Sequence, residues 1–300
     1  LLKIALYRMH DGDRLLLVVH HLVVDGVSWR ILLEDLSTVY QQLEQGDGAV
    51  LPPKTTSFLD WSAKLQEYAA SAAVQRELPY WQSILNQQVE EIPKDKAGGR
   101  NCVATTADES FELSTEDTEQ LTGKVHRVYG TEINDILLSA LGLSIQKQFG
   151  LKRVLVSLEG HGREELIEEM DSSRTVGWFT TTYPVLLDMD EAGSTRDYVI
   201  RVKDQLRRVP RKGIGYGLLR YMQAGEAVLK ETPGADILFN YLGDFGSGIP
   251  PAGGEQLFRF TGENRGDQVN GNYENAHSIT ITGLTASGQL HVTVSYSREQ

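Results

Sequence analysis

The first part of the chain alternates between strand-like and helix-like spacing of apolar residues. Residues 3–9 and 14–21 are rich in β-formers and are joined by a loop with an Asp-Gly dipeptide, which favours a hairpin turn. The run 15–19 is apolar at every position, which predicts a strand buried on both faces. From Trp29 to Leu43 the apolar residues recur at helical spacing. The segment therefore predicts a β-hairpin followed by an amphipathic helix.

Capping signals and helical spacing predict further helices along the chain. Ser57 and Asp60 have the spacing of a capping box, and a helical pattern runs from there towards Leu85, with Pro79 as a kink or break. Pro184 cannot donate a backbone hydrogen bond, so its strand should lie at a sheet edge or carry an irregularity. The same criteria predict helices over 114–129, 133–149 and 195–209, and strands over 111–113, 154–158, 179–187, 236–242, 278–284 and 290–296.

Strands and helices are mixed in both halves, which predicts an α/β or α+β fold with mixed sheets and flanking helices. The chain has 300 residues, more than a typical single domain, so we expect two lobes. Residues 93–107 are polar and rich in Gly and Lys, and we place the boundary between the lobes there. The expected domains are residues 1–100 and residues 101–300.

Composition and charge narrow the range of partners. Hydrophobic residues make up 40% of the chain and charged residues 23%, as in ordinary globular proteins, and the formal net charge is −12. An acidic surface repels phosphate backbones and anionic lipids, so we expect neither nucleic acid nor membrane as a partner. The single cysteine, Cys102, cannot form an intramolecular disulfide, and no apolar run is long enough to span a bilayer. These features are typical of a cytoplasmic protein.

One stretch of the chain is densely basic. A solvated helix face is the favoured interpretation, and a docking patch for an acidic partner is the alternative. Its cations are Arg201, Lys203, Arg207, Arg208, Arg211 and Lys212.

Residues 20–26, His-His-Leu-Val-Val-Asp-Gly, form the first candidate for chemistry. They follow an apolar strand and precede a helix, a position where rigid scaffolds present reactive groups. Because neighbouring residues on a strand point to opposite faces, only one of His20 and His21 can face a given cleft. A histidine titrates near neutral pH and is a plausible base, and Asp25, next to Gly26, can turn back towards it or hold the loop by a salt bridge. A pair of core or turn histidines without chemistry is the alternative.

Two further strand ends carry polar side chains. Glu159 follows the apolar run 154–158 and opens a Glu-Gly-His-Gly-Arg segment, whose glycines permit close approach of a ligand. Desolvation at such a strand end raises the pKa of a carboxylate, which suits proton abstraction. Asn240 and Tyr241 lie near the end of the strand 236–242 and can donate hydrogen bonds to a developing oxyanion. A charged strand-to-loop transition and a tyrosine packed in the core are the alternatives.

Several familiar catalytic motifs are absent from the sequence. It contains no Gly-x-Ser-x-Gly, no phosphate-binding loop with Gly-Lys-Ser or Gly-Lys-Thr, no His-Glu-x-x-His and no paired cysteines. Residues 213–217 are rich in glycine, but they follow no clear strand and lack the dinucleotide-binding spacing. Spacing alone therefore predicts a two-lobed enzyme with a His and a Glu.

The motifs just described also resemble those of a known family. Residues 20–26 are similar to the histidine motif of the condensation superfamily of nonribosomal peptide synthetases, whose members resemble chloramphenicol acetyltransferase in fold. Because five segments occur in one family's order over most of the chain, the likeness is specific. The segments that resemble the epimerization branch of that superfamily are 20–30, 159–164, 174–184, 212–217 and 239–243.

The resemblance implies two acetyltransferase-like lobes, with a tunnel that receives the phosphopantetheine arm of a carrier protein. The catalytic glutamate maps to Glu159, and Asp25 is expected to be structural and paired with Arg174. Family members have more sequence before the histidine motif and a little more after the last strand, so the first lobe is expected to be incomplete. The histidine motif maps to His20, His21, Asp25 and Gly26.

The implied activity is inversion of the α-carbon of an aminoacyl or peptidyl thioester held on a carrier protein. Removing the α-proton on one face and returning one on the other requires two groups, and we expect Glu159 and His21, one from each lobe. The thioester acidifies the α-proton, so no pyridoxal or metal is required and we expect no cofactor bound by the domain itself. Asn240 or Tyr241 would donate hydrogen bonds to the enolate oxygen.

The expected partners are the upstream peptidyl carrier domain and the adjacent synthetase modules, in which the chain would act as a monomeric unit. A condensation domain, which forms amide bonds, has the same fold and histidine motif and is the nearest alternative. The setting of Glu159 and the presence of Trp178 argue against it. The sequence also leaves open a dual condensation–epimerization enzyme and an inactive module that only docks a carrier protein.

Overall fold

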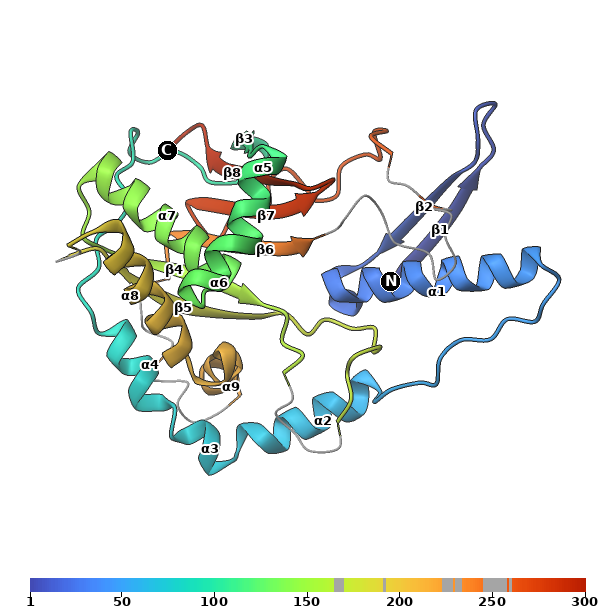
Figure 1. The fold of residues 1–300 in the computed structure, drawn as a ribbon, viewed down its shortest axis with the longest axis horizontal. Coiled ribbons are helices and arrows are strands. Elements are labelled where there is room, and N and C mark those ends of the chain that lie inside the picture. The colour runs from blue at the N-terminus through green and yellow to red at the C-terminus, as the bar shows by residue number, and fades with distance from the viewer. Residues whose placement is uncertain (165–169, 191–192, 223–228, 230–233, 245–257, 259–260) are drawn as a thin grey trace. The chain divides into compact units, whose positions relative to one another are not determined.

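The computed structural model describes all residues except 165–169, 191–192, 223–228, 230–233, 245–257 and 259–260. The strands are β1 (Leu2–Tyr7), β2 (Arg14–Val19), β3 (Thr106–Glu112), β4 (Arg153–Gly160), β5 (Thr181–Asp188), β6 (Ile237–Asp244), β7 (Ile279–Ala286) and β8 (Gln289–Ser297). The α-helices are α1 (Gly26–Glu44), α2 (Phe58–Ala69), α3 (Ala72–Gln75), α4 (Leu78–Leu85), α5 (Thr115–Glu119), α6 (Val125–Tyr129), α7 (Ile133–Phe149), α8 (Thr195–Arg208) and α9 (Ile214–Tyr221). Shorter helical turns are η1 (His21–Val23), η2 (Val103–Thr105), η3 (Gln120–Lys124) and η4 (Pro210–Gly213). Figure 1 carries the strand and α-helix labels.

The predicted elements are largely confirmed. The helix expected over 133–149 is α7, and Ser57 caps the start of α2 as predicted, since the Asp60 backbone N–H donates to Ser57 Oγ at 3.0 Å. Pro79 does not kink a helix but lies in the first turn of α4, where its missing N–H has no intrahelical partner to lose. The helical stretch towards Leu85 is divided into α2, α3 and α4, and α9 was not predicted because it begins after Gly213 without a side-chain cap.

The chain divides into two compact units. The first consists of Leu1–Tyr68, His161–Thr180 and Gly248–Arg259, and the second contains the remaining residues. The boundary expected at residues 93–107 lies inside the second unit. The assignment of residues 1–100 and 101–300 to two acetyltransferase-like lobes stays a prediction.

A six-stranded mixed sheet organises the second unit, in the order β3-β8-β7-β6-β4-β5. β6 runs parallel to β4 and β7, and the other neighbouring strands are antiparallel. β5 is an edge strand, which confirms the prediction from Pro184. Mixed strands with flanking helices confirm the predicted fold class.

Helices cover this sheet through apolar side chains. Leu155 on β4 faces Leu186 on β5, and with Ala235 they form a buried cluster against which Ile84 and Leu85 of α4 pack. β4 and β5 contain near-continuous apolar runs, so both faces of these strands must be buried by other parts of the chain. Among the described residues, no helix is both long and apolar enough to cross a bilayer.

The first unit begins with the predicted hairpin, in which β1 and β2 pair antiparallel from Leu2–Val19 to Tyr7–Arg14. The expectation that residues 15–19 are buried on both faces is wrong, since Leu15 is 38% and Val18 is 51% exposed. The reason is that the described sheet has only these two strands, so an apolar strand here is not enclosed as it would be inside a larger sheet.

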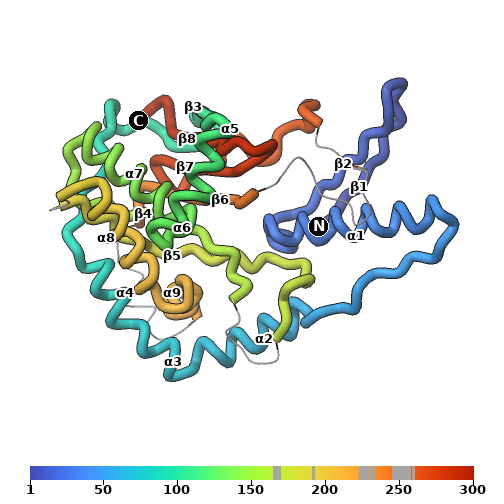
Figure 2. The backbone as a smooth tube through the Cα atoms, viewed as in Figure 1, coloured from blue at the N-terminus to red at the C-terminus, as the bar shows by residue number. Residues whose placement is uncertain are grey.

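Residues 161–180 belong to the first unit, although they follow β4 of the second (Figure 2). The link is a buried ion pair in which Arg163 Nη2 donates to both carboxylate oxygens of Asp25, at 3.0 and 3.1 Å. Arg163 Nη1 also donates to the carbonyls of Ser172 and Thr175, at 2.7 and 2.8 Å. The guanidinium lies 4.0 Å from the centre of the Phe179 ring. One arginine therefore joins the start of α1 to three points on this segment.

The expected pairing of Asp25 with Arg174 is wrong. Asp25 pairs with Arg163, whereas Arg174 donates to Asp35 and, at 3.4 Å, to Glu34 on α1. Arg163 and Arg174 both link the segment 161–180 to α1 or its N-cap residue. The expectation that Arg174 pairs with this region is therefore correct, but its partners are Glu34 and Asp35 and not Asp25. The geometric reason is that Asp25 caps α1 from inside the loop, whereas Glu34 and Asp35 lie further along the helix.

Replacement of Asp25 with Ala should destabilise the protein. It would leave the Arg163 guanidinium buried without its carboxylate, since the two side chains are only 3% and 6% exposed, and would cost about 3–5 kcal/mol. Urea unfolding measures this, with Asp11→Ala as a control. Asp11 forms an exposed pair with Arg14, so its loss should cost less than about 1 kcal/mol. An Asp25→Ala protein of unchanged stability that had lost only turnover would refute the structural role.

His277 should make stability depend on pH. It is half-buried, its Nε2 lies 3.2 Å from Ser157 Oγ, and burial lowers its pKa, while the carboxylate of Asp236 partly opposes that shift. As pH falls through about 6.5, the unfolded chain gains a proton that the folded chain does not, so the folded state loses stability. The free energy of unfolding of the wild type should therefore fall more between pH 7.5 and 5 than that of His277→Gln. Exposed His10→Gln should behave like the wild type, and equal pH slopes in all three proteins would contradict the prediction.

Candidate active site

The two neighbouring histidines after β2 have different roles in the structure. The Nδ1 of His20 accepts a hydrogen bond from the Leu22 backbone N–H at 3.2 Å and so caps the short turn η1. The side chain of His21 is exposed, and its ring packs edge-on against Trp178 with centroids 5.2 Å apart. Of the pair, His20 is therefore the one that uses a ring nitrogen to hold the backbone of the turn.

Asp25 fixes the loop that carries His21. Its Oδ1 accepts from the Ser28 backbone N–H at 2.7 Å, as expected of an N-cap residue, and its Oδ2 accepts from the Phe179 backbone N–H at 3.1 Å. Together with Arg163, these donors satisfy the carboxylate, whose side chain is only 3% exposed. Gly26 begins α1, and a side chain there would meet no atom within 4 Å, so packing does not explain this glycine.

Trp178 and its neighbours are held against α1. Ser28 Oγ donates to the Gly177 carbonyl at 2.9 Å and accepts from the Gly177 N–H at 3.0 Å. Phe179 packs against Phe58 and Trp61 of α2 with centroids 5.1 and 4.6 Å apart. The hydrogen bonds and the aromatic cluster set the backbone on both sides of Trp178, and thereby the surface on which the His21 ring lies.

Glu159 lies near the end of β4 in the second unit. β4 is paired with β6 in parallel register, Leu158 opposite Phe239, so the next residues, Glu159 and Asn240, project from the same face of the sheet. Asn240 Nδ2 donates a hydrogen bond to Glu159 Oε2. The structure thus brings together two residues 81 positions apart that the sequence indicated separately.

Tyr241 points away from this pair. Adjacent strand residues face opposite sides, and the Tyr241 hydroxyl lies 2.8 Å from Thr285 Oγ1 on β7. Of the two donors considered for an enolate oxygen, Asn240 alone shares a sheet face with Glu159.

A glycine-rich turn lies beside Glu159. Gly213 has φ of +88°, and a Cβ there would lie 2.0 Å from the ring of Tyr183 on β5. A Cβ on Gly160 would lie 3.6 Å from the same ring and 3.7 Å from the Lys212 carbonyl oxygen. The start of the motif over 212–217 therefore lies beside Gly160, the residue after Glu159, which the sequence did not reveal because no strand precedes the motif.

Arg163 is a site residue that was not predicted. Arg163 lies four residues after Glu159 in the same Glu-Gly-His-Gly-Arg segment. This position was the only feature of the sequence that could have indicated its importance. His21 and Arg163 lie in the first unit, and Glu159 and Asn240 lie in the second. Among the described residues, no three His, Cys, Asp or Glu side chains are grouped as in a metal site.

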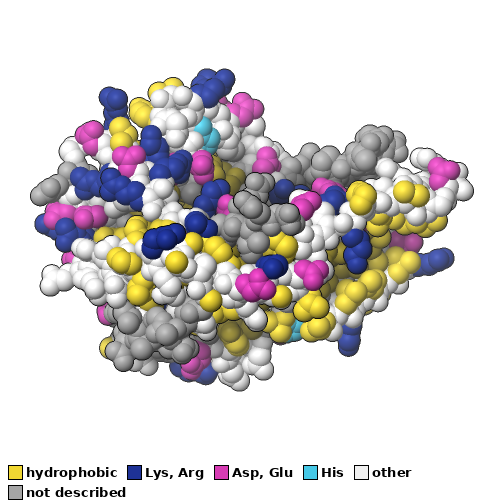
Figure 3. Space-filling model, turned by 90° about the horizontal axis from the view of Figure 1, so that it is seen from below, with side chains coloured by type: hydrophobic (Ala, Val, Ile, Leu, Met, Phe, Trp, Pro, Cys, Tyr) yellow, Lys and Arg dark blue, Asp and Glu magenta, His cyan; other side chains and the backbone are white. Residues whose placement is uncertain are grey.

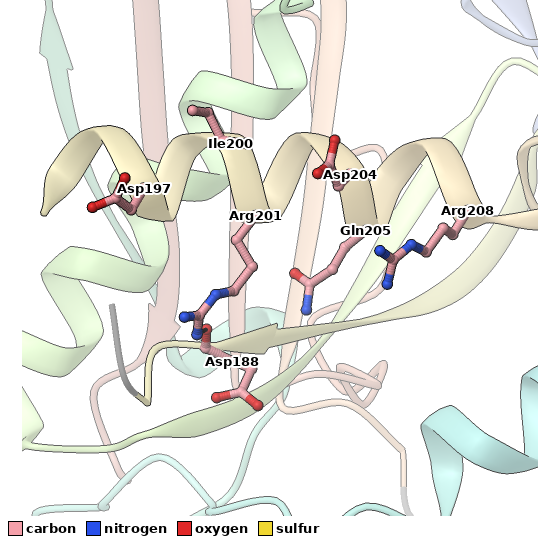
Figure 4. A pocket seen from close by; sticks show the side chains of 7 residues that line it. All are labelled: Asp188, Asp197, Ile200, Arg201, Asp204, Gln205 and Arg208. Carbon is pink, nitrogen blue, oxygen red and sulfur yellow. Dashed lines mark hydrogen bonds between the residues drawn. The ribbon is translucent and has the colours of Figure 1, made fainter. Parts of the chain in front are cut away.

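A cavity of about 570 Å³ lies between α8 and the end of β5, and it contains none of these residues (Figure 4). Its lining includes Arg201 and Arg208 but also three carboxylates, those of Asp188, Asp197 and Asp204. Charges of both signs therefore line this cavity.

The basic stretch over 201–212 is largely engaged within the chain. Arg207 pairs with the buried Asp135 at 2.9 Å, Lys203 donates to the Tyr129 carbonyl at 2.9 Å, and Arg201 donates to the carbonyls of Asp188 and Asp190. Acidic and basic side chains are also interspersed on the face seen in Figure 3. These contacts favour the solvated helix face over a docking patch.

Comparison with known proteins gives consistent results. The family model described as "Condensation domain" matches residues 1–300. Surfactin synthase subunit 1 of Bacillus subtilis (strain 168) is 46% identical over 99% of this chain, which spans 8% of that protein. The epimerization domain from the third module of tyrocidine synthetase B is 41% identical with a TM-score of 0.92, and the match covers 100% of this chain and 66% of that one.

A more distant structure shares the fold alone. The first condensation domain of the CDA synthetase is 20% identical with a TM-score of 0.63, over 99% of this chain and 61% of that one. The chain thus spans a small part of its synthetase relatives and about two thirds of the solved domains. With a match to the family model over its whole length, this chain belongs to the condensation-domain family, whose fold is chloramphenicol acetyltransferase-like.

Proposed function

We propose that this chain is an epimerization domain, which inverts the α-carbon of an aminoacyl or peptidyl thioester from L to D. One observation carries the proposal. The chain is 41% identical to a solved epimerization domain but 20% identical to a solved condensation domain. The carboxylate of Glu159, held by Asn240 at the end of a central strand, supports it chemically because epimerization needs a base at the α-carbon.

The reaction requires two proton-transfer groups. One removes the α-proton, which leaves an enolate of the thioester, and the other returns a proton to the opposite face, so no atom is gained or lost. We assign these roles to Glu159 and His21. The thioester carbonyl stabilises the enolate and makes the α-proton acidic enough for residues of this kind.

The supporting residues act on these two groups. Asn240 orients the Glu159 carboxylate through its Nδ2, and its second N–H can stabilise developing negative charge on the enolate oxygen. His20 caps the turn that presents His21, and Asp25 and Gly26 begin the helix behind it. Trp178 supports the His21 ring from one side.

The proposed setting is a nonribosomal peptide synthetase in the cytoplasm. An upstream peptidyl carrier domain would deliver the substrate on its 4'-phosphopantetheine arm, and adjacent modules would use the product. The domain would act as a monomeric unit of that larger chain and bind no cofactor of its own. These proposals draw on the synthetases to which the chain is similar.

Two other functions are compatible with the fold. A condensation domain would join two carrier-bound acyl groups through an amide bond, with His21 as the group next to the attacking amine. An inactive domain would bind the carrier without any reaction. The match to a condensation family model keeps the first of these functions open.

Exchange of the α-hydrogen with D₂O tests the proposal. The full-length protein, with its carrier loaded with an L-aminoacyl thioester, should incorporate deuterium at the α-carbon and yield D-product. Glu159→Gln keeps the size of the side chain but removes the base, and His21→Ala removes the ring. Each should slow epimerization by about 10²–10⁴-fold, which mass spectrometry and chiral analysis of the released acid measure.

His10→Ala is the matched control, because His10 is an exposed histidine at the tip of the hairpin and should have no effect. Amide formation with a second loaded carrier, in the absence of α-deuteration, would make the protein a condensing enzyme. Carrier binding with neither reaction would leave only the docking function.

A further inference from the structure

Glu77 is a buried carboxylate that the proposed reaction does not use. It is the N-cap residue of α4 in the second unit and is only 6% exposed. Its Oε2 accepts a hydrogen bond from Trp81 Nε1 at 3.3 Å, whereas its Oε1 is buried without a hydrogen-bond partner among the described residues. Burial raises the pKa of Glu77, and the Trp81 hydrogen bond and the charge of Arg211 oppose the shift. A buried carboxylate with an unsatisfied oxygen is costly to the fold and suggests a specific role.

The carboxylate lies against the first turn of α9. A Cβ on Gly215 would lie 1.9 Å from Glu77 Oε2, so only glycine leaves room for the carboxylate at this point. The next residue, Tyr216, packs against Trp81 with ring centroids 5.1 Å apart. Glu77 and its partner Trp81 therefore fix where α9 begins.

The turn before α9 has an unfavourable backbone. Arg211 and Lys212 have φ of +44° and +50°, in the left-handed region that non-glycine residues rarely adopt, and Gly213 follows at +88°. Two consecutive non-glycine residues in this region persist only where the surroundings hold them. One such stabilising interaction is the ion pair between Arg211 and Glu77, whose Nε and Oε1 atoms lie 3.9 Å apart.

This turn reaches the backbone next to the proposed catalytic base. The Lys212 carbonyl oxygen lies 3.7 Å from the place of a Cβ on Gly160, the residue after Glu159. The Tyr183 ring packs against both Gly160 and Gly213. The turn and the end of β4 therefore pack against the same ring and lie side by side.

We propose that Glu77 is a positioning residue for Glu159, whose buried carboxylate holds the left-handed turn Arg211–Gly213 against Gly160. The role rests on the proposed function, in which Glu159 transfers the α-proton. Glu77 touches neither substrate nor Glu159 and acts only through the turn.

The test uses Glu77→Gln and Glu77→Ala in the full-length protein. The amide that Glu77→Gln introduces can still accept from Trp81 but has no charge for Arg211, whereas Glu77→Ala removes both contacts. We expect kcat for epimerization to fall about tenfold in Glu77→Gln and about a hundredfold in Glu77→Ala, with KM within about twofold, because a misplaced base slows the chemical step and not substrate binding. Glu67→Gln, a change at an exposed glutamate, is the control and should leave both constants unchanged.

Backbone amide exchange gives a readout that does not depend on activity. Peptides over 210–216 and 159–160 should exchange faster in both Glu77 variants, while the rest of the sheet keeps its wild-type rates. Unchanged kcat, or a fall in kcat that matches a uniform rise in exchange over the whole unit, would overturn the role of Glu77. If the wild type itself shows no α-deuteration, the proposed function fails, and the local exchange then decides separately whether Glu77 holds the turn.

Discussion

The buried pair of Asp25 and Arg163 is the interaction on which the first unit depends. A buried ion pair stabilises a fold only when further hydrogen bonds offset the cost of removing its charges from water. Here the carboxylate accepts from Ser28, Phe179 and Arg163, and the guanidinium also donates to Ser28 Oγ and two backbone carbonyls, so that only its Nε lacks a hydrogen-bond partner among the described residues. The pair connects the loop after β2 to a segment about 140 residues later in the chain.

A different constraint governs the second unit, namely strand register. Side chains alternate along a strand, so a slip of one residue between β4 and β6 would send Asn240 to the face opposite Glu159. The apolar residues of these strands hold the register, with Val156 and Ile237 both nearly inaccessible to solvent. The position of a polar pair at the strand end is thus set by apolar packing several residues before it.

The sequence predicted well what depends on local periodicity and single residues. Turn chemistry indicated the hairpin, capping signals located α2 and α5, and Pro184 predicted an edge strand. It predicted poorly what depends on contacts between distant segments. A buried carboxylate has no local signature of its partner, so Asp25 was assigned to Arg174 instead of Arg163. Burial of residues 15–19 also failed, because it is a property of the neighbouring strands and not of the run itself.

Part of the candidate site followed from the sequence through motif order, and the rest required geometry. The five segments indicated Glu159, His21 and Asn240, but spacing alone did not show that Asn240 donates to Glu159 while Tyr241 faces the other side. The structure also gives side chains of the same type different contacts. His20 uses its Nδ1 for a cap, and Asp25 is held in a buried ion pair. In the proposed reaction, His21 and Glu159 transfer the protons, and residues that do not react hold each of them in place within its own unit.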